Sequence, residues 1–331
     1  MTVRNIVVAG AGILGLWQAF TLARAGHRVR LVEKSAEPFA RAASAYAGAM
    51  LGPFCETEAQ AAEVRAPGLD AIRLWQRDFP GTVVAGTLVV APARDLPELD
   101  RFARLTECHT RIEADELARL EPDLADRYGL GLFYPQEGHV DPIAAMAHLL
   151  EGARDAGCTA DFGVDWDNAH AEPGTLVIDC RGMGARTDLS QLRGVRGERL
   201  VIETREVSFS RPVRLLHPRH PLYVVPWGDG RFMVGATVIE SEDESPVTVR
   251  SALELLSLAY ALHPAFGEAQ VITQGAGVRP SWPDNYPKIL PREEVIHVNG
   301  SYRHGYLLAP IMAERVAAFL ANGERDPLFF A

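Results

Sequence analysis

The stretch TVRNIVVAGAGILGLWQAFTLARAGHRVRLVEKS (residues 2–35) decides the fold of the first part of this chain. It begins with a short apolar, β-branched run (5–10), continues with a helical pattern that Gly26 closes, and ends with a second apolar run that stops at Glu33. A buried parallel strand is typically a continuous apolar run, and a glycine after the last apolar position is typical of a helix C-terminus. The stretch therefore predicts a strand, a helix and a second, parallel strand.

Three glycines lie at the turn between the first strand and the helix, with the spacing G-x-G-x-x-G (Gly10, Gly12 and Gly15). The first allows a tight turn, the second lets a pyrophosphate approach the backbone, and the third lets the helix pack close to the strand. The helix N-terminus offers free N–H groups and a partial positive charge to phosphates. Glu33 lies 23 residues after Gly10, where it can accept hydrogen bonds from ribose hydroxyls. The unit predicts a dinucleotide site without distinguishing FAD from NAD.

The segment that follows, RAASAYAGAMLGP (41–53), consists almost wholly of Ala, Gly and Ser. Small residues permit close backbone approach to a flat or highly charged ligand, whereas an NAD-binding domain normally continues with another regular α/β pair. An alanine-rich helix is the alternative interpretation, although Gly48 and Gly52 disfavour a helix there. The segment therefore favours FAD over NAD.

Composition and charge limit the classes of function. The chain has 331 residues, 47% of them hydrophobic and 23% charged, which is ordinary for a globular protein with room for two domains. The net charge of −10 argues against a partner that is nucleic acid or anionic membrane. The four cysteines form no CxxC pair, so we expect reduced thiols and no metal site. No signal peptide and no apolar run of about 20 residues is found, which predicts a cytoplasmic protein.

The rest of the chain alternates between strand-like and helical patterns. Strand patterns with glycine turns occupy 81–92, 129–142, 174–186 and much of 197–240. Helical patterns occupy 98–109, 113–122, 142–156 and 248–264. In GTLVIDCRGMGAR (174–186) an apolar strand ends in a turn with Gly182 and Gly184, which predicts a second close-approach site; a plain β-turn is the alternative. The Asp-Gly pair in WGDGR (227–231) predicts a hairpin.

This order of patterns predicts two interleaved domains. We expect an α/β plus α+β fold, in which a Rossmann-type FAD-binding domain with a three-layer, mostly parallel sheet is interleaved with a substrate domain on an antiparallel sheet. The first domain is expected to take residues 1–78, 139–196 and 272–331, and the second 79–138 and 197–271.

Two C-terminal stretches resemble a known family. GVRPSWPDNYPKI (277–289) and GSYRHGYLLAP (300–310) are similar to the C-terminal motifs of the D-amino-acid oxidase superfamily of flavoproteins, and most of all to those of the glycine oxidases of thiamin biosynthesis. ASAYAGAML (43–51) and YVVP…GRFMVGAT (223–237) resemble two further blocks. The four motifs occur in the family's order and cover most of the chain.

The resemblance implies roles for five residues of an amino-acid site. Arg279 is expected to form a bidentate pair with the substrate carboxylate, which the Tyr223 hydroxyl also reaches. Arg303 is expected to contact either the substrate or the backbone of its own loop. His304 replaces the family's asparagine and is expected to donate a hydrogen bond to the substrate or the flavin and to titrate near neutral pH; a loop histidine with only a local partner is the alternative. Met50 is expected beside the flavin, with core packing as the alternative; for Tyr223 the alternative is a half-buried strand position.

The resemblance also implies how FAD is held. The loop before residue 305 is expected to cross the flavin, with the N–H groups of 305–308 facing it and Pro310 in the first turn of the following helix. Cysteine is absent beyond Cys180, so non-covalent binding is expected. The residues expected to bind FAD are Gly10, Gly12, Ile13, Leu14, Gly15, Glu33, Lys34, Arg41, Ala42, Ser44, Ala47, Gly48, Met50, Cys180, Gly182, Arg279, Arg303, His304, Gly305, Tyr306 and Leu307.

The reaction that the resemblance implies is the oxidative deamination of a small amino acid such as glycine. A hydride passes from Cα to the flavin, an imine forms, and dioxygen yields hydrogen peroxide; the imine of glycine would serve thiazole synthesis. We nominate no Asp or Glu as a general base. The alternatives are an oxidase or dehydrogenase for D-amino acids or sarcosine, a non-catalytic FAD-binding protein, and an NAD-dependent dehydrogenase. The sequence leaves the oligomeric state open.

Overall fold

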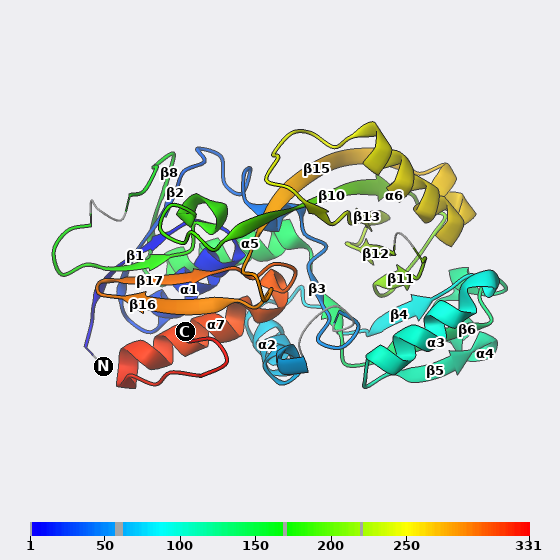
Figure 1. Cartoon of the computed structure of the whole chain (residues 1–331), viewed down its shortest axis with the longest axis horizontal. Helices are drawn as coiled ribbons and strands as arrows, with labels where there is room; N and C mark the ends of the chain where they lie inside the picture. The colour runs from blue at the N-terminus through cyan, green and yellow to red at the C-terminus, as the bar shows by residue number, and fades with distance from the viewer. Residues whose placement is uncertain (1, 57–61, 168–170, 219–220) are drawn as a thin grey trace.

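The computed structural model describes residues 2–56, 62–167, 171–218 and 221–331, arranged around two large sheets (Figure 1). The α-helices are α1 (Ile13–Arg24), α2 (Arg65–Asp78), α3 (Leu96–Leu105), α4 (Ala114–Leu120), α5 (Pro142–Asp155), α6 (Val249–Leu262) and α7 (Gly305–Asn322). The strands are β1 (Asn5–Ala9), β2 (Arg28–Glu33), β3 (Met50–Leu51), β4 (Thr87–Val90), β5 (Thr110–Glu113), β6 (Leu130–Tyr134), β7 (Gly138–His139), β8 (Thr159–Phe162), β9 (Leu176–Asp179), β10 (Arg193–Glu203), β11 (Val213–Leu215), β12 (Leu222–Pro226), β13 (Arg231–Gly235), β14 (Ile239–Glu240), β15 (Gln270–Ser281), β16 (Lys288–Arg292) and β17 (Val295–Asn299).

The first sheet has six strands in the order β16-β17-β9-β1-β2-β8. Its ladders are parallel except for the β16–β17 pair. The apolar strand β1 lies at its centre, between β2 and β9, as a strand buried on both faces should. The predicted strand–helix–strand unit and the mostly parallel sheet are confirmed, and Gly26, with φ of 86°, follows the last turn of α1.

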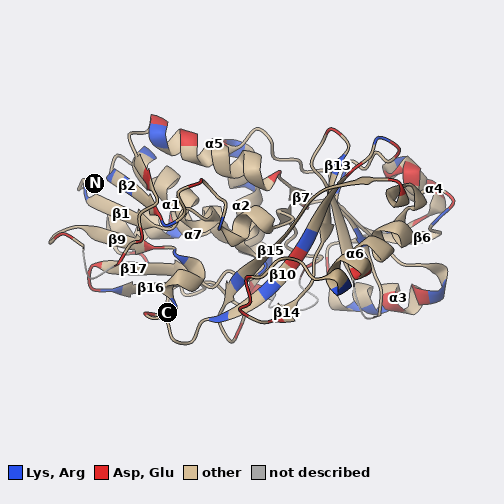
Figure 2. Cartoon of the chain, turned by 90° about the horizontal axis from the view of Figure 1, so that it is seen from above, with Lys and Arg blue, Asp and Glu red and all other residues tan. Residues whose placement is uncertain are grey.

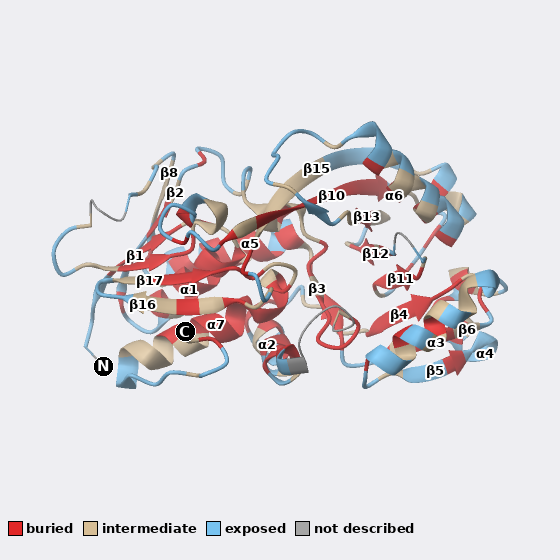
Figure 3. Ribbon diagram, viewed as in Figure 1, coloured by how far each residue is buried: buried red, intermediate tan, exposed pale blue. Residues whose placement is uncertain are grey.

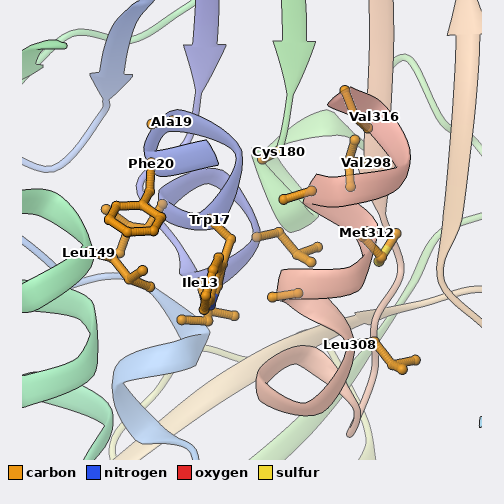
Figure 4. Packing of buried hydrophobic residues seen from close by; sticks show 14 of the residues in the cluster. Ile13, Trp17, Ala19, Phe20, Leu149, Cys180, Val298, Leu308, Met312 and Val316 are labelled. Atoms are coloured by element: carbon orange, nitrogen blue, oxygen red, sulfur yellow. The ribbon is translucent and has the colours of Figure 1, made fainter. Parts of the chain in front are cut away.

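The helices α1, α5 and α7 pack together on this sheet, with α1 in the middle (Figure 4). Trp17 of α1 contacts Phe20 and Trp75 edge-on, with ring centroids 5.6 and 4.9 Å apart. Figure 4 shows Phe20 facing Leu149 of α5. On the opposite face of the sheet, side chains of the central strands pack against residues 164 and 166.

The second sheet has nine strands, eight of them in the order β14-β10-β13-β12-β11-β4-β6-β5, and it is antiparallel except for the β4–β11 pair. Helix α6 covers β10, β12 and β13. The hairpin predicted at 227–231 is confirmed, since Trp227 and Arg231 are joined by a backbone hydrogen bond of 2.9 Å between β12 and β13. The predicted antiparallel sheet beside a parallel one, and therefore the fold class, is confirmed.

A long two-stranded ribbon of β10 and β15 joins the two halves of the molecule (Figure 1). The ladder runs from Arg193 opposite Ser281 to Glu203 opposite Gln270. Both of the domain boundaries expected at 196/197 and 271/272 lie within these strands. The division into domains therefore stays a prediction, and the ribbon belongs to both halves.

Helix α7 begins earlier than the sequence indicates. It starts at Gly305, so Pro310 lies inside the helix and not in its first turn as predicted. A proline there leaves the carbonyl four residues earlier without its helical partner. That carbonyl, of Tyr306, accepts a hydrogen bond of 2.7 Å from the Trp75 indole N–H. The buried Trp75 on α2 thus allows the helix to continue through Pro310.

Charge and burial agree with the composition. Figure 2 shows Lys and Arg interspersed with Asp and Glu over both halves, and Figure 3 shows buried residues both in the central strands and in α1 and α7. All four cysteines are unpaired, as predicted. Within the described ranges no helix is long and apolar enough to span a membrane.

Candidate functional site

A cavity of about 600 Å³ lies where the two sheets meet. Its walls come from the carboxyl ends of β1, β2 and β9, the segment 40–52, the second half of β15, and the loop that leads into α7. Segments from both ends of the chain therefore build one site. In a parallel sheet the carboxyl ends of the strands are the usual place for ligands.

The three glycines of the first turn meet different demands. Gly10 has a φ of 97°, and a Cβ there would lie 2.6 Å from the Cys180 carbonyl oxygen. A Cβ on Gly15 would overlap the Gly10 carbonyl oxygen, so Gly15 packs the helix on the strand and does not line the cavity. At Gly12 a Cβ would meet only the Ser44 hydroxyl, at 3.5 Å. No internal packing explains Gly12, whose bare Cα leaves room in the cavity.

Glu33 is fixed at the end of β2 by the backbone around it. Its two carboxylate oxygens accept hydrogen bonds from the N–H groups of Ala11 at 2.7 Å and Ser35 at 2.9 Å. Each oxygen keeps a second acceptor site. Glu33 also lines the cavity, so it remains available to a hydroxyl of a bound ligand.

The small-residue segment is not the alanine-rich helix given above as the alternative. It forms only a short 3-10 helix, Ala43–Tyr46, before strand β3. Arg199 donates to the Ala45 carbonyl at 3.0 Å, and the Tyr306 hydroxyl donates to the Ser44 carbonyl at 3.1 Å. These bonds from β10 and α7 hold the segment along the cavity wall.

Alternate glycines on β15 make room for this segment. A Cβ on Gly275 would overlap the Tyr46 ring, and one on Gly277 would lie 3.2 Å from the Ala43 backbone. Residues two apart on a strand share a face. The next residue on that face is Arg279, which lines the cavity. The motif G-x-G-x-R thus places the segment and the guanidinium side by side.

The cationic side chains that line the cavity differ in their partners. Four of the five form ion pairs: Lys34 with Asp165, Arg41 with Glu244, Arg181 with Asp179 and Asp188, and Arg303 with Glu56. Among the described residues, Arg279 has no carboxylate partner; its Nη1 donates only to the Thr237 carbonyl, at 3.3 Å. Burial lowers the pKa of Arg279 below its ordinary value. Arg279 is half-buried, and Glu56 attracts it electrostatically without forming an ion pair with it, so an anionic ligand would be favoured beside its guanidinium.

Tyr223 faces the same cavity from β12. Burial raises the pKa of its hydroxyl, so the hydroxyl stays a hydrogen-bond donor. A Cβ on Gly48 would lie 2.8 Å from the Tyr223 ring and would overlap the Met233 methyl group. Gly48 therefore gives these side chains their space, and Met50 lines the cavity beyond it.

Glu56, which was not nominated from the sequence, also lines the cavity. Its carboxylate accepts from Arg303 at 2.6 Å and from Arg214 at 3.1 Å. Burial by itself would raise the pKa of Glu56, but nearby positive groups, Arg303 and Arg214 foremost and Arg279 among them, outweigh it and lower the pKa below its ordinary value. Glu56 is therefore an anion at neutral pH and a poor proton acceptor. Neither Glu56 nor Arg214 carries a local sequence signal, since their partners are far away in the chain.

His304 precedes α7 and is 2% exposed. Burial lowers its pKa to about 4, which contradicts the expected titration near neutral pH. Its Nε2 has no hydrogen-bond partner among the described residues. The neutral ring thus offers a buried polar atom beside the cavity. The N–H of Leu308, expected to face a flavin, instead donates to the His304 carbonyl at 2.8 Å, so only the three residues before it keep free N–H groups.

The structure brings the predicted site residues together. Apart from Gly15, every residue nominated above lines the cavity: Gly10, Gly12, Ile13, Leu14, Glu33, Lys34, Arg41, Ala42, Ser44, Ala47, Gly48, Met50, Cys180, Gly182, Tyr223, Arg279, Arg303, His304, Gly305, Tyr306 and Leu307. Their individual roles stay predictions. No group of three or more His, Cys, Asp or Glu side chains in the described ranges could hold a metal ion.

Comparison with known proteins gives consistent matches. A family model described as DAO, FAD dependent oxidoreductase, matches residues 5–319. A Rhizobium etli protein, named as a thiamine biosynthesis oxidoreductase (ThiO), is 50% identical over 326 residues, which cover 98% of both chains. The glycine oxidase of Bacillus licheniformis is 26% identical over 345 residues, covering 95% of this chain and 92% of its own.

A solved structure supports the fold. The glycine oxidase from Bacillus cereus superposes with a TM-score of 0.82 over 98% of this chain and 99% of its own, at 21% identity. At that identity the likeness bears on the arrangement of helices and strands alone.

Proposed function

The chain belongs to the family of FAD-dependent oxidoreductases, with FAD as its cofactor, and on this premise we propose that it oxidises the carbon–nitrogen bond of a small amino acid such as glycine. The family match confirms the resemblance drawn from 277–289 and 300–310. It also makes the chain an enzyme and removes a plain NAD-dependent dehydrogenase from the alternatives.

The residues of the cavity fit FAD. The room left at Gly12 suits a pyrophosphate, and the acceptor sites of Glu33 suit ribose hydroxyls. The free N–H groups at the start of α7 suit an electron-rich ring edge. When bound, FAD supplies a two-electron acceptor for the Cα–H bond. Among the described ranges no cysteine lies beyond Cys180, so we propose that the cofactor is held without a covalent bond.

One observation carries the proposed substrate class: among the cavity cations, only Arg279 lacks a carboxylate partner in the described residues. A planar guanidinium binds a carboxylate through two parallel hydrogen bonds. The Tyr223 hydroxyl can donate a further bond, since its raised pKa keeps the proton on it. Held at its carboxylate, an amino acid has its Cα fixed in the cavity, and such positioning supplies much of the rate enhancement.

The charges around the cavity favour the neutral amine that the reaction needs. Arg279, Arg303 and Arg214 face the single carboxylate of Glu56, so these groups are positive in sum. Positive surroundings lower the pKa of a bound ammonium group. The proton passes to water, and the nitrogen lone pair then forms the imine as the Cα hydrogen leaves with two electrons. Glu56, held as an anion, does not take part as a base.

For glycine the proposed overall reaction converts the amino acid and dioxygen into the imine of glyoxylate and hydrogen peroxide. The name of the Rhizobium etli relative supports a place in thiamine biosynthesis. We propose that the imine is used to build the thiazole. Deletion of the gene should then make growth depend on added thiamine. The readout is whether thiamine alone restores growth of the deletion strain.

The central test is Arg279→Ala. Loss of a buried charge pair typically costs 2–5 kcal/mol, so we expect KM for glycine to rise about 100-fold or more, with the flavin absorbance of the purified protein unchanged. Arg279→Lys keeps the charge but not the planar guanidinium, so its KM for glycine should lie between those of the wild type and Arg279→Ala. Loss of FAD from Arg279→Ala, or an unchanged KM, would contradict the proposal.

The remaining alternatives are separated by the choice of substrate. Peroxide formation with glycine, sarcosine and D-alanine, measured side by side, ranks the three amines. If quinone but not dioxygen restores the oxidised flavin spectrum, the protein is a dehydrogenase. A protein whose flavin is bleached by none of the amines without oxygen is a non-catalytic FAD-binding protein.

A further inference from the structure

Two glycines without side chains form the part of the cavity wall next to the Arg279 guanidinium. Gly197 of β10 lies opposite Gly277 of β15 in the ladder, and neither residue carries a side chain. A Cβ added to Gly197 would overlap Cζ and both terminal nitrogens of the Arg279 guanidinium. The φ of Gly197 lies outside the left-handed region, so its backbone does not itself require glycine. The three atoms nearest to that position all belong to the Arg279 guanidinium.

The other side of the guanidinium is held by neutral groups. Its Nη1 donates to the Thr237 carbonyl, and Thr237 is in turn fixed to Glu198, the neighbour of Gly197 on β10. The Thr237 N–H donates to the Glu198 carbonyl at 3.1 Å, and the Glu198 N–H donates to the Thr237 hydroxyl at 2.8 Å. Arg279 is thus placed by a flat strand and a carbonyl oxygen. No carboxylate of the described residues forms an ion pair with it, since Glu56 is paired with Arg303 and Arg214.

We infer that Gly197 is a positioning residue, which sets how deep the Arg279 guanidinium lies and thereby where the substrate carboxylate binds. A side chain at 197 would push the guanidinium into the cavity by more than an ångström. Misplacement on that scale can lower catalytic efficiency about 100-fold. The inference deepens the proposed function and rests on it, because it takes Arg279 as the group that binds the carboxylate.

The experiment is a double-mutant cycle on the FAD-loaded protein, using Gly197→Ala, Arg279→Ala and the double variant. Acetate is the probe: its dissociation constant is read from the change it causes in flavin absorbance, and KM and kcat for glycine are measured beside it. We expect Gly197→Ala to weaken acetate binding and to raise KM at least 10-fold, with a smaller change in kcat. In the Arg279→Ala background the same change should have no further effect.

Gly194→Ala is the matched control. Gly194 lies on the same strand, and a Cβ there would lie 2.6 Å from the side chains of Glu242 and Val278, away from Arg279. It is expected to change thermal stability without changing the affinity for acetate. A role of Gly197 in strand packing alone would make the two glycine variants behave alike.

Each outcome decides the inference. Unchanged acetate binding in Gly197→Ala overturns it. It is also overturned if Gly197→Ala lowers the affinity for acetate equally in the wild-type and Arg279→Ala backgrounds. If Gly197→Ala does not fold but the double variant does, the clash between the new methyl group and the Arg279 guanidinium prevents folding, and the inference stands. If neither folds, Gly197 serves the strand and the inference falls. Unchanged acetate affinity in Arg279→Ala alone would instead reject the proposed function.

Discussion

At the scale of single residues, the cavity combines Arg279, which forms no ion pair within the described residues, with polar groups that stay in one protonation state. His304 is the clearest case, because burial lowers its pKa to about 4 and keeps the ring neutral at physiological pH. In an unfolded chain a histidine titrates near 6.5. The folded protein therefore binds this proton less well than the unfolded chain does, and stability is lost as the pH falls from about 6.5 towards 4.

Replacing His304 by Asn should remove that loss, because asparagine offers hydrogen-bonding groups without a proton to gain. Between pH 7 and pH 4.5 we expect the wild-type protein to lose about 2 kcal/mol more of its free energy of unfolding than the variant does. Urea titration at both pH values, at one FAD concentration, measures the difference. His139, whose pKa burial also lowers to about 4, contributes equally to both proteins. Identical pH dependence would show that the His304 ring gains its proton without cost.

At the scale of elements, the junction of α2 and α7 shows how one hydrogen bond permits a helix to form around a proline. Trp75→Phe should leave the Tyr306 carbonyl buried without a donor and lower the free energy of unfolding by about 1–3 kcal/mol. Pro310→Ala restores a backbone N–H four residues after that carbonyl. We therefore expect Trp75→Phe to cost less in the Pro310→Ala background, as measured by urea unfolding.

Trp17→Phe provides the control for this cycle. Trp17 is a fully buried tryptophan in contact with Trp75, but its indole N–H has no partner among the described residues. Its substitution should therefore cost the same with and without Pro310. If Pro310→Ala reduced the cost of both tryptophan substitutions equally, packing and not the hydrogen bond to the Tyr306 carbonyl would explain the result.

Elements with local signals could be predicted from the sequence, and elements that depend on distant partners could not. The strand–helix–strand unit and the hairpin at 227–231 carry their own glycines and apolar periods. Strand β15 contains Gly275, Gly277 and Pro280, each unfavourable in an isolated strand, and it forms because β10 pairs with its whole length. The start of α7 was misplaced for a similar reason, since the donor from Trp75 is invisible in the local pattern.

The candidate site follows the same division. Residues within motifs, such as Gly12, Glu33 and Arg279, could be nominated from their neighbours in sequence. Glu56 could not, because its role arises from Arg303 and Arg214, which reach it only in the folded chain. The low pKa of His304 was missed because burial, and not residue type, determines it.

At the scale of the whole molecule, the cavity joins both halves, so its ligand should stabilise all of it. A ligand that binds only the folded state adds about 4 kcal/mol at a thousandfold excess over its dissociation constant. We therefore expect the melting temperature of the FAD-depleted protein to rise with added FAD and to stay unchanged with NAD. A melting temperature independent of FAD would contradict a cofactor site in this cavity.

Two glycine variants sharpen that test. Gly12→Ala should leave the FAD-free protein as stable as the wild type, because its Cβ meets only the Ser44 hydroxyl, but should reduce the rise caused by FAD. Gly10→Ala should destabilise the FAD-free protein itself, because of its φ of 97° and the close Cys180 carbonyl. If both variants respond alike, Gly12 serves the packing of the protein, as Gly10 does, and not the binding of the cofactor.

The packing of α1 against α7 has a consequence for biosynthesis. On the ribosome, α1 emerges early, yet the helix that covers one of its flanks and completes the cavity wall is made only after nearly all of the remaining chain. The apolar flank of α1 therefore lacks this partner until α7 has been synthesised. Residues 305–307 complete the cavity wall, so we expect translation products that stop before Gly305 to bind no FAD and to be colourless.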